Sequence, residues 1–179
     1  MLLLETDLTH DSATLDGMIA ALPPSWQARI TRKKPPFSRV QSAVAYTMLA
    51  DILQTHYGIS TLPAIRTAAN GMPFFEQCPL YFSISHCQTA VAVIVEDHPV
   101  GLDVQNIFTK ISPALATRIA APHDPAAMTA AELTALWTQK EASAKLDGGG
   151  LSLGLANLPL PHHTLTTKTS DGFVVTVAE

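Results

Sequence analysis

Four residues of this chain could together bind a phosphate-bearing ligand through a metal ion. Asp103 and Gln105 lie two positions apart in VGLDVQ at 100–105, and Glu141 and Lys145 lie four apart in WTQKEASAK at 137–145. Magnesium takes one or two carboxylates and completes its shell with water and phosphate oxygens, so Asp103 and Glu141 could supply the carboxylates. The alternative stays open that Glu141 and Lys145 form an exposed pair of the common, weak kind, with Asp103 at a turn and Gln105 in solvent.

The helix expected to carry Glu141 has signals at both ends. TAAE at 129–132 is a capping-box pattern, and DGGG at 147–150 ends a helix because glycine adopts the left-handed conformation freely. Trp137, Glu141 and Lys145 follow one another at i, i+4, so they lie in line beside an apolar stripe of Leu133, Leu136, Trp137 and Ala144.

The residues at 100–105 are expected to form a strand. Side chains alternate on a strand, so Asp103 and Gln105 share one face while Leu102 and Val104 share the other. The helix and the strand could therefore present their oxygen atoms to one cation.

Composition excludes several classes of protein. The chain has 179 residues, is 47% hydrophobic and carries a net charge of −4, which argues against a general nucleic-acid binder. Its basic residues are clustered, however, with Arg29, Arg32, Lys33, Lys34 and Arg39 within eleven positions. This segment suits a small anionic ligand or an acidic protein partner, or it is a solvated connection.

No targeting or membrane signal is evident. The two cysteines, Cys78 and Cys87, match no zinc spacing, and no apolar run approaches the ~20 residues of a membrane span. The start, MLLLETD, lacks the basic and long apolar regions of a signal peptide. We expect a soluble, cytoplasmic protein with no membrane or nucleic-acid partner.

The order of expected elements indicates an α+β class. Helices are expected from Asp11 or Ser12 to about Leu22, over 26–31, from the capping-box pattern SRVQ at 38–41 as far as Tyr57, from Ser112 to about Ala120, and over 129–147. Strands are expected over 2–5, 80–85, 90–95, 100–105, 155–158, 164–168 and 173–177, with Asp171-Gly172 as a hairpin turn. Helices followed by three strands thus occur twice, which predicts a duplicated architecture.

These motifs resemble those of a known family. GLDVQ at 101–105 followed by WTQKEASAK at 137–145 resembles GxDxE and WxxKEAxxK, the paired signature of the 4′-phosphopantetheinyl transferase superfamily. The second motif matches at every defining position. NGMP at 70–73 is similar to the GKP turn of Sfp-type members, FSISH at 82–86 to their F-N-I-S-H segment, and RVQS at 39–42 to their arginine-led helix start.

The resemblance implies an enzyme that transfers the phosphopantetheine arm of coenzyme A to a serine of an acyl, peptidyl or aryl carrier protein, with Mg²⁺ as cofactor and adenosine 3′,5′-bisphosphate as by-product. It implies two pseudo-symmetric α+β lobes in one monomeric chain, residues 1–98 and 99–179, with the active-site cleft between them.

The resemblance also assigns residues. Asp103, Gln105 and Glu141 would hold Mg²⁺. Glu141 would in addition accept the serine proton, and Lys145 would hold a pyrophosphate oxygen. Coenzyme A would be bound by Arg32, Lys33, Arg39, Gly71, Pro73, Ser85, His86, Lys140 and Lys145, with His86 and Arg39 on the 3′-phosphate. Lys140 is about 100° round the helix from Glu141 and would face either phosphate or solvent.

Two positions depart from the family pattern. Gln105 replaces a glutamate and removes a negative charge from the metal site, and Met72 replaces the lysine of GKP. We expect weaker or altered metal dependence from the first and a missing cation contact from the second. The alternative function is a coenzyme A or carrier-protein binding homologue with weakened catalysis.

Overall fold

The structure, a computed structural model, describes residues 1–122, 124, 128–148, 163–170 and 172–179. The first part of the chain forms β1 (Leu2–Glu5), α1 (Ser12–Ala20), α2 (Pro24–Thr31), α3 (Pro36–Asp51), the π-helical turn η1 (Ile52–His56), β2 (Ile65–Thr67), β3 (Pro73–Phe75), β4 (Tyr81–His86) and β5 (Val91–Glu96). The second part forms β6 (Gly101–Asn106), α4 (Pro113–Ile119), α5 (Ala130–Leu146), β7 (Leu165–Ser170) and β8 (Phe173–Ala178).

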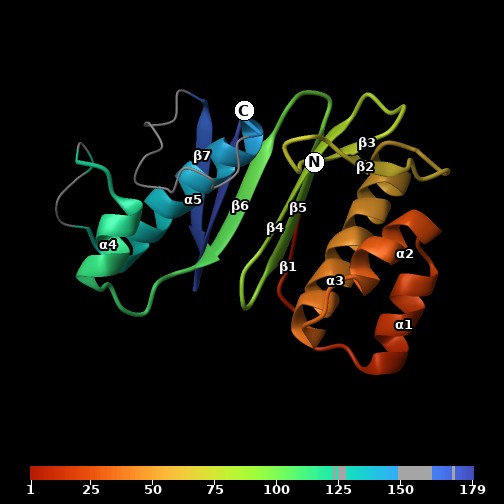
Figure 1. The fold of residues 1–179 in the computed structure, drawn as a ribbon, viewed down its shortest axis with the longest axis horizontal. Coiled ribbons are helices and arrows are strands. Elements are labelled where there is room, and N and C mark those ends of the chain that lie inside the picture. The colour runs from red at the N-terminus through yellow and green to blue at the C-terminus, as the bar shows by residue number, and fades with distance from the viewer. Residues whose placement is uncertain (123, 125–127, 149–162, 171) are drawn as a thin grey trace.

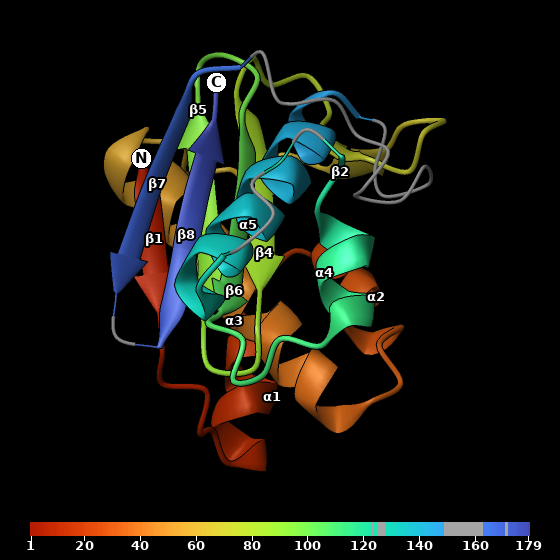
Figure 2. The ribbon, with the colours of Figure 1, turned by 90° about the vertical axis from the view of Figure 1, so that its left-hand side faces the viewer.

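Two antiparallel sheets form the centre of the molecule (Figure 1). The first sheet has the order β1-β5-β4, and the second has the order β6-β8-β7. Helix α3 packs against β5 on the outer face of the first sheet, and α1 and α2 pack against α3. Figure 2 shows α5 lying across β6 and β8 of the second sheet. This mixture of helices and small sheets is compatible with the predicted α+β class.

The side-chain alternation of β5 explains how the layers are held together. Val91, Val93 and Val95 belong to the core beneath α1–α3, whereas Ala92 and Ile94 belong to a second core shared with Leu102 and Val104 of β6. A strand buried on both faces is apolar throughout, as VAVIV is. The two sheets therefore pack against each other through β5, with helices outside each.

The edges of the two sheets meet at β4 and β6 through serine side chains. The Ser83 hydroxyl accepts a hydrogen bond from the Leu102 amide at 3.0 Å, and the Ser85 hydroxyl accepts one from the Val104 amide at 3.1 Å. Both serines are buried. These contacts satisfy edge amides of β6 that would otherwise be buried without a partner.

Gly101 allows α5 to lie against β6. A Cβ atom at this position would be 2.0 Å from the Ala142 carbonyl oxygen and 2.9 Å from the Leu146 amide nitrogen. Both are backbone atoms of the helix, so a larger residue would push α5 away from the strand that carries Asp103. The glycine of the GxDxE pattern is thus required by the packing of α5 against β6.

The strongest local signals are confirmed. Helix α5 begins with a complete capping box, in which the Glu132 amide donates to the Thr129 hydroxyl and the Thr129 amide donates to Glu132. Helix α1 begins at an Asp11 cap and α4 at a Ser112 cap. The predicted strands in the described residues are present with shifts of one or two residues at their ends.

One helix start was predicted wrongly. Helix α3 begins at Pro36 with Pro35 as its N-cap residue, so Ser38 lies inside the helix and is no cap. Proline is well suited to the first turn because its missing N–H would have no partner there.

The short hairpin of β2 and β3 was predicted only as a turn. The strand expected at 155–158, the helix stop at Gly149-Gly150 and part of the turn at Asp171-Gly172 lie outside the described residues. None of the described helices is long and apolar enough to span a membrane.

Candidate active site

Asp103 lies on β6 with its carboxylate almost wholly buried, at 5% exposure. Its Oδ1 accepts hydrogen bonds from the Ser85 hydroxyl at 2.7 Å and from the Lys145 ammonium at 2.8 Å. Its Oδ2 is also buried but has no hydrogen-bond partner among the described residues. A buried carboxylate oxygen left without a donor is costly, and a cation at this oxygen would remove that cost.

Glu141 lies near Asp103 on α5. Burial and the Asp103 carboxylate raise the pKa of Glu141 to about 7, against the opposing effects of Lys145 and Arg118. A carboxyl group whose pKa is raised by burial and by a neighbouring carboxylate is typical of a cation site or of a catalytic pair. The structure therefore brings together Asp103, Glu141 and Lys145, which we call the Asp103–Glu141–Lys145 cluster.

Lys145 is the cationic member of this cluster. Its ammonium donates to the Leu102 carbonyl at 2.7 Å and to Asp103 Oδ1 at 2.8 Å. An ammonium has three N–H donors, so one remains beyond these two bonds for an anionic ligand. The side chain is 29% exposed and can be reached from solvent.

Gln105 follows Asp103 by two residues on β6 and therefore lies on the same face of the strand. It is partly exposed. The residues present fit a divalent cation through the unpartnered Asp103 oxygen and the Glu141 carboxylate. An amide oxygen at 105 is a neutral donor that Mg²⁺ also accepts.

A pocket of about 420 Å³ beside the first sheet gathers basic residues. We call it the cation pocket. It is lined by Arg29, Arg32, Lys33, Ser42, Ala45, Tyr46, Pro73, Ile84 and His86. Four of the predicted ligand-binding residues therefore meet in one place although they come from three parts of the chain: Arg32 and Lys33 from the segment after α2, Pro73 from β3 and His86 from β4.

His86 connects the cation pocket to the Asp103–Glu141–Lys145 cluster. Partial burial, together with the positive charges of Lys145 and Lys33, lowers the pKa of His86. The same histidine is therefore close enough to both groups to sense their charges. An anion placed between them would favour the protonated imidazole and gain an additional cation.

Three polar residues that line the cation pocket, Arg29, Ser42 and Tyr46, were not among the predicted coenzyme A contacts. Arg29 donates to the Thr67 hydroxyl at 2.6 Å, which holds it at the pocket wall. It belongs to the basic segment, so the clustering of charge could have identified it. Ser42 and Tyr46 lie four residues apart on α3. Ser42 ends the RVQS segment but was assigned no role there, and no motif in the sequence marked Tyr46.

Besides Lys140 and Lys145, three predicted coenzyme A contacts do not line the cation pocket. Arg39 is not among the lining residues of the cation pocket, and its guanidinium lies 4.0 Å from Asp16 of α1. Gly71 forms the exposed turn between β2 and β3 with a positive φ of 89°. Ser85 points toward Asp103.

The expected orientation of Lys140 requires correction, because the side chain faces neither phosphate nor solvent. It is completely buried, and its ammonium donates to the Ile119 carbonyl at 2.9 Å and to Asp124 at 2.8 Å. Lys140 thus fastens the end of α4 and the following turn to α5. In the same region the Arg118 guanidinium lies 5.9 Å from the centre of the Trp137 ring, a residue pairing that sequence spacing did not indicate.

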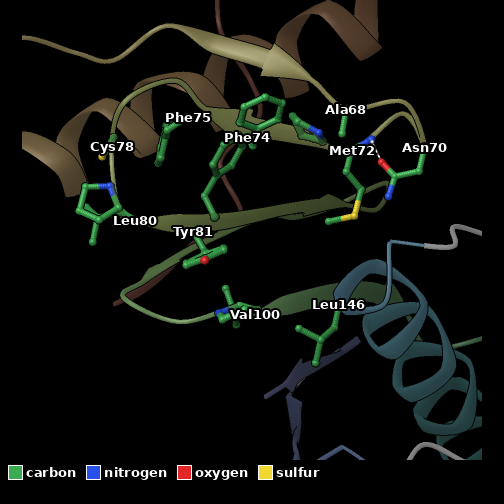
Figure 3. Close-up of a pocket in the computed structure, with 14 residues that line it drawn as sticks. Ala68, Asn70, Met72, Phe74, Phe75, Cys78, Leu80, Tyr81, Val100 and Leu146 are labelled. Atoms are coloured by element: carbon green, nitrogen blue, oxygen red, sulfur yellow. Dashed lines mark hydrogen bonds between the residues drawn. The ribbon is translucent and has the colours of Figure 1, made fainter.

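A second pocket, of about 390 Å³, shares the lining residue Pro73 with the cation pocket (Figure 3). Its lining is mainly apolar and includes Met72, Phe75, Phe82, Val100 and Leu146, without a charged side chain among the described residues. Met72, which stands where the GKP pattern has lysine, thus lines this apolar pocket and is absent from the lining of the cation pocket.

A group of potential metal ligands also occurs at the β5–β6 turn, where atoms of Glu96, Asp97 and His98 lie within 4.8 Å of one another. These side chains are engaged in ion pairs: Glu96 with the Met1 ammonium, and His98 with Asp97 and Glu179. Ion pairing accounts for this group, and it is separate from the predicted metal ligands.

Comparison with known proteins agrees with the signature. The chain is 34% identical over 125 residues to the 4′-phosphopantetheinyl transferase psf-1 of Bacillus pumilus. The chain is related to the 4′-phosphopantetheinyl transferases. The alignment covers 62% of this chain and 53% of the relative, so the chain spans about half the length of that transferase. No model of a protein family matches the chain.

Proposed function

We propose that this protein is a 4′-phosphopantetheinyl transferase that moves the phosphopantetheine arm of coenzyme A to a serine of a carrier protein and releases adenosine 3′,5′-bisphosphate. The observation that carries the proposal is the position of the Asp103–Glu141–Lys145 cluster near a pocket with three cationic side chains from the basic segment and a histidine. Coenzyme A has two separated anionic groups, a pyrophosphate and a 3′-phosphate, and these two sites suit them.

In this proposal the cation pocket binds the nucleotide end. Arg32 and Lys33 are exposed and offer charge to the 3′-phosphate, and His86 adds a donor when protonated. Lys145 offers its remaining N–H to a pyrophosphate oxygen. These contacts would orient the β-phosphorus toward the acceptor serine, and positioning is most of the catalytic task in phosphoryl transfer.

Glu141 is the proposed general base. The serine oxygen forms a bond to the β-phosphorus, the bond from that phosphorus to the bridging oxygen breaks, and the serine proton goes to Glu141 directly or through a water. In the metal-free protein, burial and the Asp103 carboxylate raise the pKa of Glu141 to about 7, so this carboxylate is more basic than an ordinary glutamate. Asp103 accepts hydrogen bonds from Lys145 and Ser85 beside this base.

Asp103 and Glu141, with Gln105 as a neutral donor, would hold the magnesium ion. When bound, Mg²⁺ neutralises charge on the pyrophosphate and on the leaving phosphate. The buried Asp103 Oδ2, which has no hydrogen-bond partner in the described part of the chain, supports this assignment.

The division into pseudo-symmetric lobes at 1–98 and 99–179, with a cleft between them, is part of the proposal. Its support is that each part of the chain has its own antiparallel sheet and helical cover. Cytoplasmic location and a monomeric state stay predictions from the sequence.

The proposal is tested by incubating the protein with coenzyme A, Mg²⁺ and several apo carrier proteins, then measuring carrier mass. The expected result is a gain of one phosphopantetheine group with release of adenosine 3′,5′-bisphosphate. Asp103→Asn and Glu141→Gln should abolish the gain, while Asp51→Asn, at an exposed carboxylate on α3, should not. Binding of coenzyme A with no gain on any carrier would instead support the binding homologue that Gln105 and Met72 suggest.

A further inference from the structure

Ser83 and Ser85 of β4 have nearly the same surroundings. Both are buried, at 8% and 5% exposure, and each accepts a hydrogen bond from an amide of β6, Leu102 for Ser83 and Val104 for Ser85. Among the described residues they differ in one contact. There, only the Ser85 hydroxyl donates a hydrogen bond to a carboxylate, Asp103 Oδ1, at 2.7 Å.

We propose that Ser85 is a positioning residue that fixes the Asp103 carboxylate for metal binding, and that Ser83 serves only to join the sheets. The inference rests on the proposed function, because it assumes that Asp103 is a metal ligand. In this proposal Ser85 contacts the Asp103 carboxylate and does not make the contact with coenzyme A that was predicted from the sequence.

The direction of the side chain supports this role. Side chains alternate on a strand, so Ile84 and His86 point to the face covered by α3, where both line the cation pocket. Ser85 points the other way, toward β6, and is not among the residues that line that pocket. A direct contact between Ser85 and a ligand in the cation pocket would require the strand to turn over.

The two bonds to Oδ1 determine which Asp103 oxygen is available. The carboxyl torsion of aspartate is broad, so one bond to a flexible lysine leaves the group free to rotate. Ser85 is short, buried and itself held by the Val104 amide, so it is the stiffer of the two partners. With Oδ1 engaged by Ser85 and Lys145, Oδ2 is the oxygen left for a cation.

Residues that hydrogen-bond a metal ligand typically change metal affinity or activity about 10–100-fold when removed. Lys145 remains bonded to Asp103 in a Ser85 variant, so we expect the lower end, about 10-fold. Ser83→Ala is the matched control because it also leaves one β6 amide without its hydroxyl partner, with a similar loss of stability.

The experiment measures Mn²⁺ affinity by electron paramagnetic resonance in the presence of coenzyme A and without a carrier, so that no turnover occurs. Wild type, Ser83→Ala, Ser85→Ala and Asp103→Asn are compared, and coenzyme A affinity is measured separately in EDTA by calorimetry. Ser85→Ala should weaken Mn²⁺ binding about 10-fold. Ser83→Ala should match wild type, and coenzyme A binding in EDTA should be the same in both serine variants.

The pair Ser85→Thr and Ser85→Val gives an independent test should Ser85→Ala fold poorly, because threonine and valine have the same shape and differ in the hydroxyl. The threonine variant should bind Mn²⁺ more tightly than the valine variant.

Equal Mn²⁺ affinity in all serine variants would overturn the inference. So would a loss of coenzyme A affinity in EDTA for Ser85→Ala alone, which would make Ser85 a nucleotide contact. If Asp103→Asn binds Mn²⁺ as tightly as wild type, the proposed metal site itself fails, and that result is separate from the first two.

Discussion

Replacing Glu141 by glutamine should stabilise the metal-free protein at alkaline pH, even though it should abolish activity. Burial and the charge of Asp103 raise the pKa of this carboxyl from 4.5 to about 7. Between these values the folded protein binds more protons than the unfolded chain, so ionisation of Glu141 lowers the free energy of unfolding as the pH rises. Below about pH 4.5 the group is protonated in both states and contributes nothing.

The size of the effect follows from the shift. A difference of about 2.5 pK units corresponds to roughly 3 kcal/mol at 1.36 kcal/mol per unit. Because Glu141 is partly exposed, solvent screening reduces this, and we expect about 1–2 kcal/mol at pH 8. For a chain of this size that is a rise in melting temperature of roughly 3–6 °C.

The assay is urea or thermal unfolding of wild type and Glu141→Gln in EDTA at pH 5 and pH 8. The variant should be more stable at pH 8, and most of the difference should disappear at pH 5. Glu76→Gln is the control, because Glu76 forms an ion pair with Arg66 at 3.0 Å. Removing this favourable charge should not raise the free energy of unfolding at either pH. A Glu141→Gln variant that is less stable than wild type at pH 8 would refute this account of the site.

Three further predictions concern the supports of the site. Gly101→Ala should lower the free energy of unfolding by about 3 kcal/mol or more and abolish activity, since the new methyl group meets the α5 backbone. The control is Gly17→Ala on α1, where the space around the glycine is open. In the same denaturation assay this variant should be as stable as wild type or more stable. Lys140→Met should cost about 3–5 kcal/mol of stability because it removes one member of the buried Lys140–Asp124 ion pair. A variant of normal stability with only a raised KM for coenzyme A would favour the predicted ligand contact instead. Gln105→Glu should lower the Mg²⁺ concentration needed for half-maximal rate, and an unchanged requirement in a titration would contradict a role for residue 105 at the metal.

Local signals predicted the helix and strand of the candidate site. Thr129 and Glu132 determine where α5 begins through contacts between neighbours in sequence, and helical spacing places Glu141 and Lys145 on one side. Alternation along β6 places Asp103 away from Leu102 and Val104. These features depend on residues a few positions apart, so the sequence is enough to predict them.

Contacts between distant segments could not be predicted in the same way. Helical geometry gives the angle of Lys140 from Glu141, but the acceptors on that side come from Ile119 and Asp124. The role of Ser85 depends on which edge of the second sheet lies beside β4. The start of α3 was misassigned because Ser38 and Gln41 match a capping pattern, while the prolines at 35 and 36 provide the actual first turn.

The central claim is that Asp103, Glu141 and Lys145 act together on the pyrophosphate of coenzyme A. It is tested most directly by the rate at which an apo carrier protein gains phosphopantetheine mass with wild type, Asp103→Asn, Glu141→Gln and Lys145→Met under saturating coenzyme A and Mg²⁺. We predict transfer by wild type and a loss of at least about 100-fold in each variant. Transfer at the wild-type rate by Asp103→Asn or Glu141→Gln would contradict the claim.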